Sequence, residues 1–307
     1  MSMVKVLISD PIHEDGVKML EDAGFDVVQK TDIGMDELKD EIGKYDAIVI
    51  RSRTKLTRDV LEHSGRLKVI ARAGVGLDNV DVKYAKDHGI EVYNSPEAPT
   101  NAVAELTLGF MLDMARDISY ADATMKQGKW EKNRLEGIEI SGRTLGIIGF
   151  GRIGYTLGKK AKALGMNVLA YDVMMDKLIQ YVEEIEAKAV ALDELLRESD
   201  FVSVHVPLLP QTKHMISIEE FSKMKKGVFV INAARGGIID EQALKNALGS
   251  GKVAGAALDV YEEEPNPDPD LIKRSNVVCT PHIGAGTEEA QRGNSTVVAE
   301  KLVKFFC

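Results

Sequence analysis

Cysteine, positive charge and long apolar segments are all scarce in this sequence. The two thiols, Cys279 inside an apolar run and Cys307 at the very end, offer neither a disulfide framework nor the ligand spacing of a metal site. No uninterrupted apolar segment is long enough to span a membrane, and the start of the chain lacks the basic and apolar regions of a signal peptide. We therefore expect a cytoplasmic protein without a metal centre.

The charge balance argues against another class of partners. Lys and Arg number 39 against 48 Asp and Glu, which gives a net charge of −9. Binding of nucleic acid needs a clustered basic surface, so no nucleic-acid partner is expected. An anionic small molecule must instead be bound by a local group of arginines.

The pattern of apolar residues indicates two α/β domains. A chain of 307 residues is long enough for two cores. Short apolar runs alternate with amphipathic segments from residue 4 to about 93, and again from Thr144 onward, which predicts two mostly parallel, doubly wound sheets. Pro96 and Pro99 interrupt the chain between them, and a long helix that connects the domains is predicted to begin near Thr100.

A glycine turn follows the first strand of the second sheet. Gly149 allows a sharp turn, Gly151 allows the backbone to approach a pyrophosphate, and Gly154 allows close packing of the next helix. Asp172, at the end of the next apolar run, is placed to accept hydrogen bonds from ribose hydroxyls. No Arg or Lys occurs at 173–175, so NAD is favoured over NADP. The alternative is a tight turn with an incidental acid.

Three charged or titratable residues follow later strands of the same sheet. Strands are predicted at 228–232, 254–258 and 277–280. Because ligands bind at the carboxyl ends of parallel strands, Arg235, Glu264 and His282 should lie at the edge that carries the glycine turn. Arg235 can bind a carboxylate bidentately, His282 can take a hydroxyl proton during hydride transfer, and Glu264 can orient the imidazole. Singly, each could be an ordinary loop residue.

Together these segments resemble the D-2-hydroxyacid dehydrogenase family. The resemblance rests on the glycine turn with Asp172, on INAARG (231–236), GAALDV (255–260) and TPHIG (280–284), and it extends over the whole chain. It implies that Arg235, Glu264 and His282 are the catalytic residues. It also implies that NAD is bound by Val75, Gly149, Gly151, Arg152, Ile153, Gly154, Asp172, His205, Val206, Pro207, Ala233, Ala234, Arg235, Asp259, His282, Gly284 and Ala285.

The resemblance further implies how the domains divide. Residues 99–284 would form a Rossmann dinucleotide-binding domain. Residues 1–98 together with 285–307 would form a discontinuous, flavodoxin-like substrate domain completed by the C-terminal helix. The family also implies a homodimer through the nucleotide-binding domains, with residues 101–134 contributing. Arg134 is a further candidate of our own, which would reach across such an interface toward a neighbour's phosphate.

The first half of the chain should select the substrate. Arg51, Arg53 and Arg72 follow two predicted strands and could bind a phosphate while Arg235 binds a carboxylate. These residues resemble the branch of the family that oxidises 3-phospho-D-glycerate to 3-phosphohydroxypyruvate, the first step of phosphorylated serine biosynthesis. In that branch the backbone N–H groups of Ala73, Gly74, Val75 and Gly76 would also bind the carboxylate. The chain would be a short form without a C-terminal regulatory domain.

Two other functions fit the same pattern. A glyoxylate or hydroxypyruvate reductase has a substrate without phosphate, and Arg51 and Arg53 would then be solvated loop charges. A corepressor that senses NAD would share the fold without turnover. A silent scaffold is hard to reconcile with an intact Arg235, Glu264 and His282.

Overall fold

Contacts divide the chain into two units. The computed structural model describes residues 3–307, and contacts group Met1–Thr100 with Ala285–Cys307 as unit 1 and Asn101–Gly284 as unit 2. The first two residues of the predicted first domain lie outside the described residues. Each unit contains one parallel sheet with helices on both faces, so the predicted α/β class is confirmed. No helix within residues 3–307 has the length and apolar composition that crossing a membrane requires.

Unit 1 has the flavodoxin-like strand order β2-β1-β3-β4-β5. Its elements are β1 (Lys5–Ile8), α1 (Glu14–Asp22), β2 (Asp26–Gln29), α2 (Met35–Ile42), β3 (Ala47–Ile50), α3 (Arg58–Leu61), β4 (Val69–Arg72), α4 (Val82–Asp87), β5 (Glu91–Asn94) and α13 (Glu288–Phe306).

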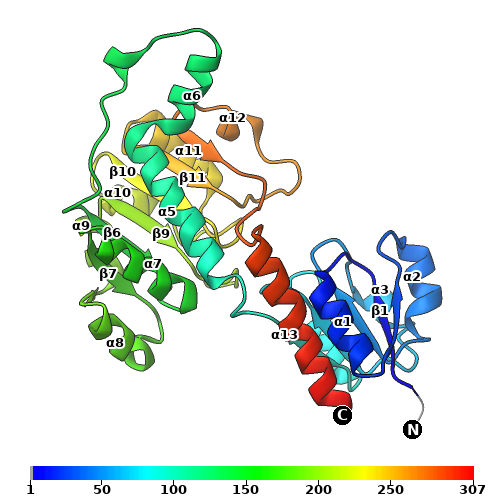
Figure 1. Ribbon diagram of the computed structural model, residues 1–307. Helices are drawn as coiled ribbons and strands as arrows, with labels where there is room; N and C mark the ends of the chain where they lie inside the picture. Colours follow the sequence, from blue (N-terminus) through cyan, green and yellow to red (C-terminus); the bar gives the residue numbers. More distant parts are fainter. Residues whose placement is uncertain (1–2) are drawn as a thin grey trace. The chain divides into compact units, whose positions relative to one another are not determined.

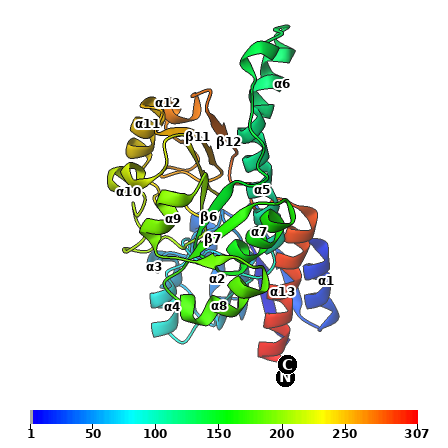
Figure 2. The same ribbon diagram turned by 90° about the vertical axis from the view of Figure 1, so that its left-hand side faces the viewer.

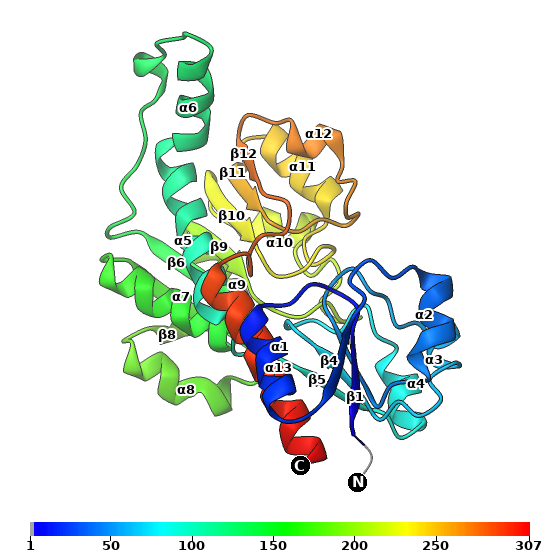
Figure 3. The same ribbon diagram turned by 45° about the vertical axis from the view of Figure 1, so that its right-hand side comes forward.

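The sheet of unit 1 is buried on both faces because its central strands are apolar at successive positions. Leu7, Ile48 and Ile70 pack with α2, α3 and α4, whereas Val6 and Val49 pack with α1 and α13. Figure 3 shows α1 and α13 on one side of this sheet and α2, α3 and α4 on the other. Alternate residues of one strand thus belong to two different layers of the core.

Helix α13 completes unit 1 through close contact with α1 (Figure 1). A Cβ on Gly16 would lie 2.8 Å from the Ser295 carbonyl oxygen, so the two helices approach at a position where only glycine fits. The Ser295 hydroxyl accepts a hydrogen bond from the His13 N–H (2.9 Å), and Asn294 accepts one from the buried Ser95 hydroxyl (2.7 Å). The prediction that the last helix belongs with the N-terminal half is therefore confirmed.

Unit 2 has the order β12-β11-β10-β9-β6-β7-β8, which is the Rossmann order with one added strand. Its elements are α5 (Thr100–Arg116), α6 (Ile118–Lys126), η1 (Lys132–Arg134), β6 (Thr144–Ile148), α7 (Arg152–Ala163), β7 (Asn167–Tyr171), α8 (Met175–Glu184), β8 (Lys188–Ala189), α9 (Leu192–Glu198), β9 (Phe201–Val204), α10 (Ile218–Lys223), β10 (Val228–Asn232), α11 (Glu241–Gly249), β11 (Val253–Leu258), α12 (Pro269–Ile272) and β12 (Val277–Cys279).

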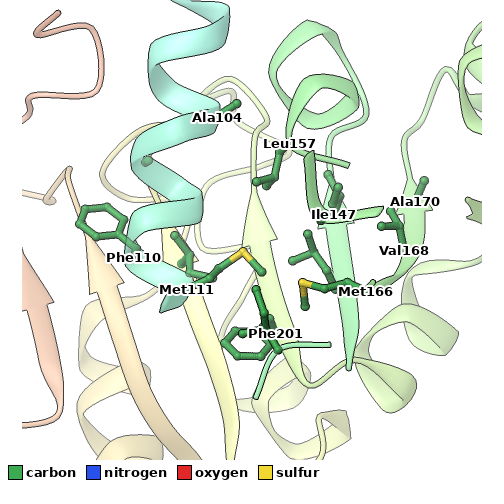
Figure 4. Close-up of a cluster of buried hydrophobic side chains, with 14 of the residues drawn as sticks. Ala104, Phe110, Met111, Ile147, Leu157, Met166, Val168, Ala170 and Phe201 are labelled. Atoms are coloured by element: carbon green, nitrogen blue, oxygen red, sulfur yellow. The ribbon is translucent and has the colours of Figure 1, made fainter. Parts of the chain in front are cut away.

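The long helix α5 is part of the core of unit 2. Phe110 and Met111 of α5 are buried in the same cluster as Phe201 of β9 and Leu157 of α7 (Figure 4). The opposite face of the sheet is covered by α9, α10, α11 and α12. The helix predicted to connect the domains thus forms a layer of unit 2.

The segment after α5, residues 118–134 and here called the arm, extends away from the sheet of unit 2 (Figure 2). Asp117 adopts a left-handed backbone conformation with φ 51° and separates α5 from α6. Within this arm, Ile118, Met125 and Trp130 are 54%, 53% and 78% exposed. Large apolar side chains this exposed are typical of an interaction surface.

We expect Gly16→Ala to destabilise the protein although alanine favours helices. The intrinsic gain of about 1 kcal/mol in a helix is offset by overpacking against the Ser295 backbone, which costs about 1–3 kcal/mol. Thermal denaturation should give a lower Tm for this variant. Gly109→Ala is the matched control, because Gly109 is helical and has no neighbouring atom within 4 Å of an added Cβ. A Gly16→Ala protein as stable as Gly109→Ala would contradict the close contact.

Candidate active site and dinucleotide-binding edge

The glycine turn has the backbone geometry that its sequence predicts. Gly149 has φ 94°, and an added Cβ would lie 2.7 Å from the His205 carbonyl. A Cβ on Gly154 would lie 2.3 Å from the Gly149 oxygen, so the turn and α7 pack too closely for any side chain. Gly151 precedes α7 and would have no protein atom within 4 Å of an added Cβ. The start of α7 therefore fits a pyrophosphate, whose charge its N–H groups favour.

Asp172 connects β7 to the glycine turn. Its Oδ2 accepts a hydrogen bond from the Phe150 N–H (2.9 Å), and its Oδ1 accepts one from the Met174 N–H (2.8 Å). Each carboxylate oxygen can accept a further bond, so this geometry fits the ribose hydroxyls as well. Val173 and Met174 are 88% and 50% exposed.

Sequence reasoning missed these exposed apolar residues. Leu208 and Leu209, which follow β9 at the same edge, are 40% and 49% exposed. Exposed apolar side chains at the edge that carries the glycine turn are suited to the flat face of an adenine ring. The signal that could have found them is an apolar residue directly after a strand end, where solvent-facing residues are usually polar.

His205 is held neutral at the end of β9. Its Nδ1 is fully enclosed with no hydrogen-bond partner within residues 3–307, and its Nε2 lies 2.8 Å from the Ser203 hydroxyl. Burial disfavours the charged form and lowers the pKa of His205 from 6.5 to about 4. The ring is therefore uncharged near neutral pH, which agrees with a structural role, and the contact of His205 with NAD stays a prediction.

Asn232 shapes the turn that carries Arg235. This buried amide accepts a hydrogen bond from the Ala234 N–H (3.1 Å) and donates one to the Arg235 carbonyl (2.9 Å). Arg235 Nη1 donates to the Ala234 carbonyl at 2.7 Å. Gly236 lies so close to Tyr261 that a Cβ would be 1.7 Å from its carbonyl oxygen. The turn after β10 is thus packed directly against the segment that leads to Glu264.

His282 and Glu264 form a pair in the structure. His282 Nδ1 lies 2.8 Å from Glu264 Oε2, and Glu264 Oε1 accepts a hydrogen bond from the Tyr261 N–H (3.1 Å). The two side chains are 49% and 36% exposed. No residue in the described range 3–307 bonds to His282 Nε2, so the pair holds one ring nitrogen and leaves the other able to exchange a proton.

Asp259 holds the backbone that presents His282. Its Oδ1 accepts hydrogen bonds from the Thr280 hydroxyl (2.6 Å) and the Ile283 N–H (2.7 Å), and its Oδ2 accepts one from the Gly284 N–H (2.7 Å). His282 itself has φ 54°, a left-handed conformation that is strained for this residue. The buried carboxylate therefore stabilises an unfavourable backbone. Asp259 was predicted as an NAD contact, and this second role was not foreseen.

A mainly apolar pocket adjoins the histidine and glutamate pair. Its volume is about 340 Å³, and it is lined by Tyr261, Glu264, Pro265, Pro267, Ile272, Cys279, Thr280, Pro281 and His282. The Tyr261 hydroxyl donates toward the Leu258 and Thr280 carbonyls, each at 3.0 Å, and so ties together the ends of β11 and β12. Burial raises the pKa of the Cys279 thiol, which agrees with an unreactive cysteine.

In unit 1 the predicted arginines are ordered by protein contacts. Arg53 pairs with the buried Asp10 at 3.1 Å, and Arg51 Nη1 donates to the Pro11 carbonyl at 3.1 Å. The Arg72 guanidinium lies over Gly74, where a Cβ would be 2.2 Å from Nη1. Arg51 and Arg53 are therefore not merely solvated charges.

The loop after β4 is fixed through its carbonyl groups. Asn94 donates to the Val75 carbonyl (2.6 Å), and the Ser95 N–H donates to the Gly74 carbonyl (3.0 Å). With the carbonyls engaged, the loop is suited to offer its N–H groups to an anion. In the second segment of unit 1, the Ala285 carbonyl accepts a hydrogen bond from the Gln291 side-chain amide at 2.6 Å. Contacts of Val75 and Ala285 with NAD stay predictions.

Two further expectations concern other parts of the chain. Arg134 lies on η1, is 74% exposed and has Glu131 as its partner at 3.4 Å. Across residues 3–307, no three His, Cys, Asp or Glu side chains are grouped as metal ligands would be.

The fold and the loops at this edge are those of a dinucleotide-binding α/β protein of the doubly wound class. Residues 108–284 match the family model for the NAD binding domain of D-isomer specific 2-hydroxyacid dehydrogenases. The chain therefore belongs to the D-isomer specific 2-hydroxyacid dehydrogenase family, and the predicted cofactor, NAD, is confirmed.

Three relatives show the range of the family. The chain is 49% identical over 303 residues to D-3-phosphoglycerate dehydrogenase of Methanocaldococcus jannaschii, which covers 98% of this chain and 57% of that protein. It is 46% identical over 307 residues to hydroxypyruvate reductase of Thermotoga maritima, with 99% of each chain covered. The holo form of D-mandelate dehydrogenase from Rhodotorula graminis superposes with a TM-score of 0.90 at 30% identity, over 99% of this chain and 95% of that one. The chain thus spans little more than half of the first relative.

We expect His205 to make stability fall in mild acid. Its pKa is about 4 in the folded protein and near 6.5 once unfolded, so the unfolded state takes up the proton first as the pH drops. The free energy of unfolding is unaffected by this group above pH 6.5, and it falls by up to about 3 kcal/mol as the pH falls to 4. Chemical denaturation at several pH values measures it.

His205→Gln should flatten this dependence, because the amide does not titrate. The exposed His63→Gln is the matched control and should keep the wild-type slope. An unchanged slope in His205→Gln would show that another group is responsible.

Proposed function

We propose that the protein is an NAD-dependent oxidoreductase that converts 3-phospho-D-glycerate to 3-phosphohydroxypyruvate. The observation that carries this proposal is the His282 and Glu264 pair, with 2.8 Å between Nδ1 and Oε2, at the sheet edge that also holds the glycine turn and Asp172. Arg235 is the third catalytic residue. Unit 2 binds the cofactor, and unit 1 supplies most of the substrate contacts.

The residues of the chain supply proton transfer and charge stabilisation. Bound NAD supplies the hydride acceptor. His282 Nε2 takes the proton of the substrate hydroxyl, and Glu264 stabilises the resulting imidazolium through Nδ1. Arg235 binds the substrate carboxylate and polarises the forming carbonyl. In the reverse direction His282 returns the proton.

The cations of unit 1 support this choice of substrate class. Arg51 and Arg53 lie on one loop, and Arg72 lies over the loop at 73–76, which offers N–H groups. A phosphate suits the guanidinium groups, and a carboxylate suits the backbone N–H groups. The phosphoglycerate dehydrogenase from Methanocaldococcus jannaschii, at 49% identity, supports this choice. Such a reaction would belong to phosphorylated serine biosynthesis.

A second candidate is a hydroxypyruvate reductase. The relative of that name from Thermotoga maritima is nearly as similar, at 46% identity. The match covers 99% of this chain and 99% of that protein. Its named substrate carries no phosphate. The two candidates therefore differ in whether the arginines of unit 1 raise the catalytic efficiency for a phosphorylated substrate.

We also propose a homodimer built through the arm of unit 2. Ile118, Met125 and Trp130 would be buried by a second copy, which accounts for apolar side chains exposed by 54%, 53% and 78%. Arg134 follows on the same arm and could then reach a neighbour's substrate.

The substrate assignment is tested by NADH absorbance with 3-phosphoglycerate and with glycerate. The wild type should show a much higher kcat/KM for the phosphorylated acid. Arg53→Ala should raise KM for 3-phosphoglycerate by about ten- to a hundredfold, the effect of a lost hydrogen bond to a charged group, and should leave the KM for NAD nearly unchanged.

Arg58→Ala is the matched control, because Arg58 is an exposed arginine of unit 1 paired with Glu62. Equal kcat/KM for the two acids would overturn the phosphate assignment and favour the reductase. Binding of NAD without turnover of either acid, in either direction, would favour an NAD sensor.

The dimer is tested by light scattering after size exclusion. Ile118→Glu combined with Trp130→Glu should lower the particle mass from that of two chains to that of one, because buried carboxylates are costly. Met35→Glu, at an apolar residue of α2 that is 44% exposed, should leave the mass unchanged. A double variant that keeps the mass of two chains would rule out the arm as the interface.

A further inference from the structure

A buried carboxylate organises the loop that carries Arg51 and Arg53. Asp10 follows β1 and is only 1% exposed. Its Oδ2 accepts hydrogen bonds from the Arg51 N–H (2.6 Å) and the Thr54 N–H (3.1 Å). Its Oδ1 accepts from the Thr54 hydroxyl (2.8 Å) and from Arg53 Nε (3.1 Å). A carboxylate removed from water needs such donors, so the loop conformation and the buried charge stabilise each other.

The same loop is held from its other side by Asn79. The Asn79 amide nitrogen lies 2.6 Å from the Arg51 carbonyl and 2.6 Å from the Thr54 carbonyl. Asp10 thus engages the N–H groups of residues 51 and 54, and Asn79 engages their carbonyl groups. A four-residue segment with both ends fixed in this way has little freedom to change its backbone.

These contacts also leave part of Arg53 available. Its Nε donates to Asp10, and its Nη2 donates to the Ser9 carbonyl at 2.6 Å. A guanidinium has five N–H donors, so three are left, and no acceptor within residues 3–307 bonds to Nη1. The side chain is 50% exposed. One edge of the guanidinium is therefore fixed to the protein, and the other can bind an oxyanion.

We propose that Asp10 and Asn79 are positioning residues that set the selectivity for a phosphorylated substrate. They act through the 51–54 loop, whose arginines would otherwise lose conformational entropy on binding. The inference rests on the proposed function, because it assigns the anion read by this loop to the phosphate of the substrate. It also explains why the turn after β1, which has no glycines, contains a buried acid.

A merely structural role would have a different signature. Loss of a contact that only stabilises unit 1 lowers Tm and reduces the active fraction, so kcat falls for every substrate. Loss of preorganisation in the 51–54 loop raises KM for the phosphorylated acid alone, because glycerate has no group for this loop to bind. The ratio of the two KM values therefore separates the roles.

The experiment measures kcat and KM for 3-phosphoglycerate and glycerate in Asp10→Asn and Asn79→Ala. Asp10→Asn keeps the shape but replaces an acceptor by an N–H donor that faces other donors. Asn79→Ala removes no buried charge and so remains informative should the first variant fail to fold. The matched control is Asp59→Asn, an exposed carboxylate of unit 1 paired with Lys39.

Both test variants should raise KM for 3-phosphoglycerate by about tenfold or more, with kcat and the KM for glycerate within about twofold of wild type. Asp59→Asn should change neither. An unchanged ratio of KM values in a folded variant, or an equal rise for both acids, overturns the inference. A wild type that does not distinguish the two acids overturns the proposed substrate and this inference together, whereas a selective wild type with an unaffected ratio overturns only the inference.

Discussion

Hydrogen bonds from backbone N–H groups to carboxylates at strand ends hold the functional loops of this protein in place. Asp10 follows β1, Asp172 follows β7 and Asp259 follows β11, and each accepts at least one backbone N–H from another segment. The separations in sequence are 41, 22 and 25 residues. Within each sheet, parallel strands bring such ends to the same edge, but the strand ladder stops there. The carboxylates supply the bonds that the ladder no longer provides.

The same interaction secures the opposite edge of each sheet. Asp46 accepts from the Lys5 N–H at the start of β1, and Asp200 accepts from the Thr144 N–H at the start of β6, each at 2.9 Å. There the acids are also paired with Arg66 and Lys225, which have no part in the proposed chemistry. An acid at a strand end is therefore a general device of this fold. The function of a loop held in this way depends on the other side chains that the loop carries.

The two parallel α/β sheets could be predicted from the sequence, because they depend on repeating patterns of apolar residues. Apolar runs predict the strands, and the rule that parallel strand ends share one edge leads to the expectation that Arg235, Glu264 and His282 lie on loops at that edge of the second sheet. The role of Asp259 could not be predicted, since three donors from 280–284 are distant in sequence and an aspartate reads equally as a cofactor contact. The role of Asp10 could not be predicted either, because its donors at residues 51, 53 and 54 are also distant in sequence. The arm at 118–134 breaks from α5 at a left-handed aspartate, which no periodicity signals.

Two histidines at strand ends of one sheet show why motif and environment must be read together. His205 and His282 both follow apolar runs of unit 2. In the sequence, they differ only in the residues next to them. Enclosure of His205 Nδ1 keeps that ring neutral, with a pKa of about 4. His282 is half exposed, has a carboxylate on Nδ1, and is presented by a strained backbone that Asp259 stabilises. A proton-transfer group needs both a free nitrogen and a partner for the charge it acquires, and only His282 has both.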